Sequence, residues 1–104
     1  MELTILERLL LLNVLPPSGD LTTIRIVRKL RETLSFNEQE LEEYQIRVGD
    51  DGQVKWRVTE DAKAIELGAK AHDIAVKALE KLDAEGAITE QHLSLFDKFG
   101  IGLD

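Results

Sequence analysis

The sequence predicts a mainly α-helical α+β fold with about five helices and one β-hairpin. Two observations predict it. Apolar residues recur with a helical period along most of the 104-residue chain, and the period falls to two only in residues 44–58. A chain of this length can bury one hydrophobic core but is too short for two. We therefore expect a single compact domain over residues 1–104.

Residues 2–13 form the first predicted helix, whose apolar arc is unusually wide. Glu7 and Arg8 lie on its polar side, and Leu11 falls near that side. A helix this apolar has to be covered on more than one face. We favour burial against the other helices of the domain. The alternative is a dimer interface, with Leu11 as its exposed anchor.

Pro16 and Pro17 end this helix, because proline lacks an amide donor and clashes with the preceding turn. Asp20 is a suitable N-cap for a second helix over residues 21–34. The apolar residues of this helix keep to one face. The remaining circumference carries a basic cluster, which consists of Arg25, Arg28, Lys29 and Arg31.

Ser35 and Glu38 have the spacing of a capping box, which predicts a short third helix from near Phe36 to about Tyr44. Its surface is acidic and carries Glu38, Glu40, Glu42 and Glu43. Together with the hairpin described next, the three helices follow the order of a winged-helix domain in the N-terminal half.

Residues 44–58 alternate between apolar and polar side chains on both sides of a Gly- and Asp-rich turn at residues 49–52. Two alternating runs joined by such a turn predict a β-hairpin. One face should pack Ile46, Val54 and Trp56 on the helices. The other face should leave three basic side chains in water, namely Arg47, Lys55 and Arg57.

Thr59 is predicted to cap the longest helix, over residues 60–85, whose regular stripe of charged residues should face water. Gly86 should end this helix in the left-handed conformation. Thr89 would then cap a short final helix with an apolar face, and residues 100–104 are expected to fray. That apolar face consists of Leu93, Phe96 and Phe99.

No group of residues predicts an active site, so we expect no enzyme activity, no cofactor and no metal. The chain has no cysteine, which excludes disulfides and thiolate metal sites and suits a reducing cytoplasm. His72 and His92 lie on different predicted helices, and we expect His72 to be partly buried and His92 to be exposed. Asp50 and Asp51 lack the further ligands of a calcium loop.

The apolar run at residues 9–12 is far shorter than the ~20 residues of a membrane span. Charged residues precede it and prolines follow it, without the basic leader or the small-residue cleavage site of a signal peptide. We therefore expect a cytoplasmic protein with no membrane contact.

The formal net charge of −7 disfavours contact with nucleic-acid phosphates over the surface as a whole. We therefore expect a protein that acts through protein contacts as a homodimer, with another protein as a further candidate partner. The candidate partner-binding residues are the apolar anchor and the acidic surface of the third helix, that is, Leu11, Glu38, Glu42 and Glu43.

Two alternatives stay open. A winged-helix-like DNA-binding regulator would use the basic residues Arg25, Arg28, Lys29, Arg47, Lys55 and Arg57. The objection is that its third helix, which would enter the major groove, carries four glutamates. In the second alternative the acidic surface mimics nucleic acid and inhibits a protein that binds DNA or RNA.

Four segments of the chain carry a resemblance: ELTILERLLLL, LTTIRIVRKLRE, the hairpin around Trp56, and KALEKLDAEGAITEQHLSLFDKF. Together they resemble small acidic proteins of tailed bacteriophages and prophages, in layout over most of the chain. The resemblance implies a protein made inside a bacterial host, as a host-directed or assembly factor whose partner is a host or phage protein. It assigns no functional residue.

Overall fold

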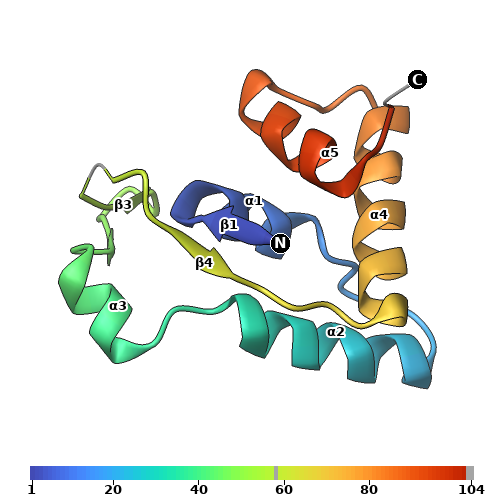
Figure 1. Cartoon of the computed structure of the whole chain (residues 1–104), viewed down its shortest axis with the longest axis horizontal. Helices are drawn as coiled ribbons and strands as arrows, with labels where there is room; N and C mark the ends of the chain where they lie inside the picture. The colour runs from blue at the N-terminus through green and yellow to red at the C-terminus, as the bar shows by residue number, and fades with distance from the viewer. Residues whose placement is uncertain (58, 103–104) are drawn as a thin grey trace.

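The computed structural model describes residues 1–57 and 59–102 (Figure 1). In chain order the elements are β1 (Glu2–Thr4), α1 (Ile5–Val14), α2 (Leu21–Leu34), α3 (Glu38–Glu43), β2 (Arg47–Val48), β3 (Val54–Lys55), β4 (Ala62–Ala64), α4 (Ala69–Ala84), the 3-10 helix η1 (Glu90–His92) and α5 (Leu93–Phe99). The predicted mainly α-helical α+β class is confirmed, with two helices, a short helix and a hairpin in the predicted order. The predicted strand position Val58 and the tail position Asp104 lie outside the described residues.

The first helix begins later than predicted, because residues 2–4 form strand β1. Thr4 is the N-cap of α1. Its hydroxyl accepts a hydrogen bond from the Glu7 amide at 3.2 Å, and the Glu7 carboxylate accepts one from the Thr4 amide at 2.9 Å. This capping box satisfies amides that the first turn of a helix leaves unpaired. The helix therefore starts at Ile5, and the residues before Thr4 are extended.

The partner of β1 is β4, which lies in a segment where the sequence predicts a helix. The two strands are antiparallel, with Leu3 opposite Lys63. The pairing continues beyond β4, where the Ile65 amide donates to the Met1 carbonyl at 2.7 Å. The predicted start of the longest helix is therefore wrong, because tertiary pairing overrides the helical preference of residues 60–67. Helix α4 begins only after Gly68.

The end of α4 is as predicted. Gly86 has a φ of 67°, in the left-handed region that glycine adopts at low cost. The amide of Ala87 donates to the carbonyl of Leu82 at 3.1 Å, and Ile88 packs against the core. The chain then turns into η1 and α5, which form the predicted short final helix.

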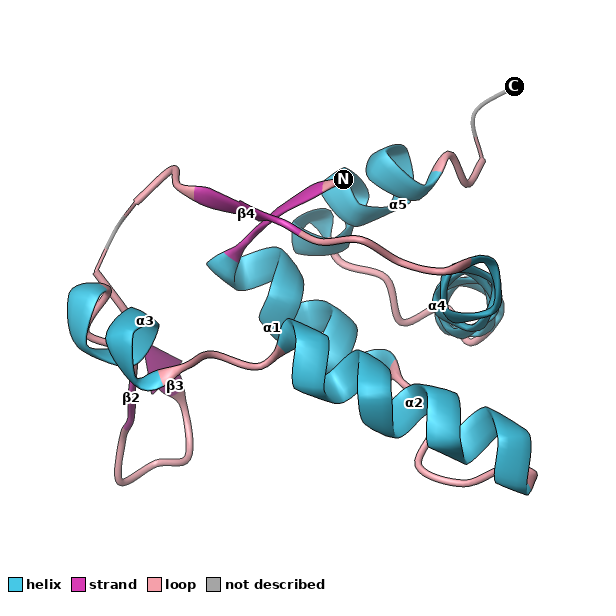
Figure 2. Ribbon diagram, turned by 60° about the horizontal axis from the view of Figure 1, so that its bottom comes forward, coloured by secondary structure: helices cyan, strands magenta, loops and turns pink. Residues whose placement is uncertain are grey.

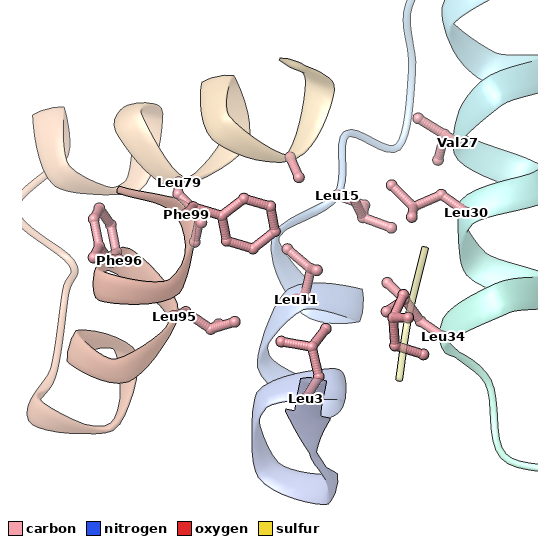
Figure 3. Packing of buried hydrophobic residues seen from close by; sticks show 12 residues of the cluster. Leu3, Leu11, Leu15, Val27, Leu30, Leu34, Leu79, Leu95, Phe96 and Phe99 are labelled. Atoms are coloured by element: carbon pink, nitrogen blue, oxygen red, sulfur yellow. The ribbon is translucent and has the colours of Figure 1, made fainter. Parts of the chain in front are cut away.

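The hydrophobic core gathers side chains from β1, α1, α2, α4 and α5 (Figure 3). Leu11 lies at its centre, between Phe99 and Leu95 on one side and Leu15 on the other (Figure 3). The side chain of Leu11 is fully buried, with 0% exposed. Its prediction as an exposed dimer anchor is therefore wrong, because α2, α4 and α5 surround α1 within one chain. The favoured interpretation of α1 as a core helix is confirmed.

Helix α3 and the hairpin form a separate lobe at one end of the molecule (Figures 1 and 2). Among the described residues, none between 35 and 64 belongs to the core cluster. Helix α3 is capped by Asn37, whose side chain accepts a hydrogen bond from the Glu40 amide at 2.8 Å. The predicted cap at Ser35 is therefore wrong by two residues. The hairpin pairs Arg47 with Lys55. Its three predicted packing residues, Ile46, Val54 and Trp56, are half-buried.

Candidate protein-contact surfaces

A groove of about 830 Å³ lies between α2 and α4. Its apolar lining comes from the end of α1 and the loop after it, from α2, and from α4. It includes five half-buried residues, Val14, Pro16, Ile26, Ile74 and Ala78. The groove therefore presents apolar surface to solvent beside the core. A concave apolar surface of this kind is where a protein receives side chains of a ligand or partner.

One edge of the groove is basic. Lys70, Lys77 and Lys81 line it, and at about 100° of rotation per residue they fall on one stripe of α4. The stripe extends about 16 Å along the helix, at about 1.5 Å per residue. Ile74 and Ala78 lie beside it, so the apolar lining and the basic edge run in parallel. This local charge is opposite in sign to the net charge of −7 of the whole chain.

The two aspartates that line the groove already have partners. The Asp73 carboxylate pairs with the Lys77 ammonium at 3.0 Å, in an exposed pair one helical turn apart. The Asp20 carboxylate accepts a hydrogen bond from the Thr23 amide at 2.7 Å and so caps α2 as predicted. This hydrogen bond is the main cause that lowers the pKa of Asp20. Lys70 and Lys81 have no ion-pair partner among the described residues, and they set the charge of the edge.

The predicted acidic surface is present on α3. Glu38, Glu42 and Glu43 are all exposed, whereas Glu40 turns toward the rest of the chain. Leu41, between them in sequence, is 40% exposed. The lobe therefore presents three carboxylates and one apolar side chain to solvent. Of the candidate partner-binding residues, Glu38, Glu42 and Glu43 lie together, and the buried Leu11 does not join them.

Arg8 fixes this orientation of α3. Arg8 is only 1% exposed, although the sequence places it on the polar side of the first helix. The guanidinium donates to the Leu34 carbonyl at 3.1 Å and to the Ser35 carbonyl at 2.7 Å. It also pairs with the Glu40 carboxylate at 2.5 Å and lies 4.0 Å from the centre of the Phe36 ring. Arg8 thus joins α1 to the end of α2 and to α3.

The environment of Glu40 favours its ionised form. The hydrogen bond from Arg8 is the main cause that lowers the pKa of Glu40, and it outweighs the opposing effect of burial. The amide of Asn37 and the positive charge of Lys63, whose ammonium lies 3.6 Å from the carboxylate, act in the same direction. Glu40 is therefore a structural carboxylate rather than part of a binding surface.

Glu7 is a buried carboxylate, with 3% exposed. Burial raises its pKa, but hydrogen bonds from Lys98, Thr4 and Ser94 together outweigh burial, so its pKa is lowered. The Lys98 ammonium lies 2.6 Å from the carboxylate and also donates to the Glu2 carbonyl at 2.8 Å. This pair ties α5 to the start of α1. Both ion pairs therefore serve the fold. They could not be found from the sequence because their partners are 32 and 91 positions apart.

The structure separates the basic residues of the DNA-binding alternative into two groups. Arg25, Arg28 and Lys29 are exposed in the first two-thirds of α2. The second group lies on the hairpin, beyond the other end of α2 (Figures 1 and 2), and consists of Arg47, Lys55 and Arg57. The acidic helix α3 lies at the same end as the hairpin. No continuous basic face results from the two groups.

The two histidines, His72 and His92, contact residues that belong to the fold. The His72 ring lies 5.2 Å from the Phe99 ring and is half-buried, as predicted. His92 is only 9% exposed, so its predicted exposure is wrong. Its Nδ1 accepts a hydrogen bond from the Thr89 amide at 3.0 Å, which caps the turn before α5. Within residues 1–57 and 59–102, no three His, Cys, Asp or Glu side chains are placed to hold a metal ion.

None of the helices in the described parts of the chain is long and apolar enough to cross a membrane. Comparisons with protein-family models, with curated proteins and with solved structures give no match.

Proposed function

We propose that this protein is non-enzymatic and acts through protein–protein contacts, with the groove between α2 and α4 as its main contact surface. The observation that carries the proposal is the parallel arrangement of an apolar lining and a basic edge. Ile26, Ile74 and Ala78 can receive apolar side chains, while Lys70 and Lys81 can meet acidic ones. Recognition of an amphipathic helix in a groove uses this combination.

The length of the groove supports a protein partner. The lysine edge runs about three turns along α4. A helix that lies in such a groove presents apolar residues every three or four positions, and the same spacing separates Ile74 from Ala78. The resemblance to small acidic phage proteins supports a partner that is met inside a bacterial host, in a host-directed or an assembly role.

A photoreactive side chain in place of Ile26 tests the proposal. Ile26 lines the groove, whereas Thr33 is exposed on the same helix outside it. Light should produce a covalent protein adduct from position 26 and none from position 33, when the full chain is expressed in the cells that naturally produce it. If position 26 gives no adduct, or if both positions give the same adducts, the groove is not a contact surface.

A further inference from the structure

We propose that the groove between α2 and α4 is occupied by helix α3 of a second copy of this chain. This inference rests on the proposed function, because it names the partner of the same groove. The two surfaces are complementary in charge and in the spacing of their residues, and each lies exposed at its own end of the molecule.

The outward face of α3 supplies the first surface. At about 100° per residue, Glu38, Leu41 and Glu42 lie on the side of α3 opposite Glu40. Because Arg8 holds Glu40 inward, these three side chains point away from the rest of the chain. Leu41 belongs to a small group of large apolar side chains that are at least 40% exposed.

The spacing on the groove matches this face. Glu38 and Glu42 are one helical turn apart, and so are Lys77 and Lys81 on the edge of the groove. When the two helices lie side by side, each glutamate can face one lysine. Leu41 then lies over the apolar lining of the groove. Lys77 can exchange its exposed pairing with Asp73 for the new contact at little cost, because exposed ion pairs are weak.

The position of the two surfaces excludes contact within one chain. Figures 1 and 2 place α3 at one end of the molecule and α4 at the other. Each copy therefore offers one α3 and one groove. Two copies can satisfy both contacts reciprocally, which closes the assembly as a two-fold dimer. We expect a weak dimer that dissociates at about 1 M salt. At this concentration the Debye length falls to about 3 Å, so salt screens the attraction between the glutamates and the lysines.

Charge reversal on each side tests this inference. The first variant carries Glu38→Lys and Glu42→Lys, and the second carries Lys77→Glu and Lys81→Glu. In each variant the dissociation constant of the dimer should rise at least about tenfold, since like charges then face each other. An equimolar mixture of the two variants should associate again, because α3 of either variant now faces a groove of opposite charge. The measurement is sedimentation velocity of the full-length chains at low salt.

A control matched to the second variant carries Arg25→Glu and Lys29→Glu, which make the net charge more negative by the same amount but lie outside the groove. It should associate like the unaltered chain. The inference is wrong if the unaltered chain is monomeric at every concentration, or if the mixture fails to associate. If the photoreactive residue at position 26 joins a different protein and never a second copy, the proposed function stands and this inference fails.

Discussion

The guanidinium of Arg8 and the carboxylate of Glu40 meet at 2.5 Å and connect the first helix to the third. Two backbone carbonyls, of Leu34 and Ser35, accept the other hydrogen bonds of the same guanidinium. One buried side chain therefore holds the end of α2 and the start of the lobe in place. Removal of one partner of a buried pair is costly, because the other charge stays buried without compensation.

Arg8→Met should accordingly destabilise the protein by about 3–5 kcal/mol. The methionine can fill the volume but removes the Arg8 hydrogen bonds from Glu40 and from the two carbonyls. Urea unfolding followed by Trp56 fluorescence measures the loss. Arg28→Met is the control, because the ion pair between Arg28 and Glu32 is exposed and its atoms lie 3.9 Å apart. This variant should change the free energy of unfolding by less than about 1 kcal/mol. Equal losses in the two variants would contradict the structural role of Arg8.

Leu11→Ala should destabilise the chain by about 2–5 kcal/mol, because Leu11 is fully buried in the core. Leu21→Ala is the matched control, since Leu21 is 67% exposed. Its free energy of unfolding should stay within about 0.5 kcal/mol of that of the unaltered chain. The same unfolding titration compares them. If Leu11→Ala leaves the stability unchanged but alters self-association, Leu11 lies in a dimer interface instead of the core.

Acid should destabilise the protein through Glu7 and Glu40. Both have a pKa that folding lowers from the ordinary 4.5, so the unfolded chain binds their protons more readily. Their contribution to stability is complete above pH 4.5 and is lost as the pH falls through their lowered folded values. Glu40→Gln should make the unfolding free energy depend less on pH in this range. An unchanged pH dependence in Glu40→Gln would contradict this role of the Glu40 carboxylate.

Tyr44, the only tyrosine of the chain, should ionise above its ordinary pKa of 10.0. The main cause is the hydrogen bond from its hydroxyl to the Asp61 carboxylate at 3.1 Å, assisted by burial and by nearby negative charges. An ultraviolet absorbance titration measures this pKa directly. Asp61→Ala should lower it toward 10.0, whereas Asp50→Ala, in the hairpin turn, should leave it unchanged. An unchanged pKa in Asp61→Ala would show that the lobe and the segment before β4 do not meet as described.

Local signals predicted the elements that depend on local interactions. The cap at Asp20 and the stop at Gly86 lie where the sequence places them, and α2 spans the predicted residues 21–34. Strands β1 and β4 were missed because each exists only through the other, at a separation of about 60 residues. A periodicity argument treats each segment alone, so it extends a helix through residues that a distant strand pulls into an extended conformation.

The same limit applies to the surfaces. The exposed glutamates of α3 could be predicted, because a short helix with few apolar residues has to expose most of its surface. The burial of Arg8 could not, since its hydrogen-bond partners Leu34 and Glu40 lie 26 and 32 positions later in the chain. The groove also could not be predicted, because its walls come from the loop before α2, from α2 and from α4.

Self-association through the groove is tested by the solution mass of the purified chain and of Ile26→Asp, measured by light scattering on a sizing column at low salt. A charge at position 26 would lie in the apolar lining of the groove. We expect twice the 11.7 kDa mass of one chain for the unaltered protein at high concentration, and the mass of a single chain for the folded variant. A strict monomer in both cases would contradict self-association, and equal dimers in both would place the interface away from the groove.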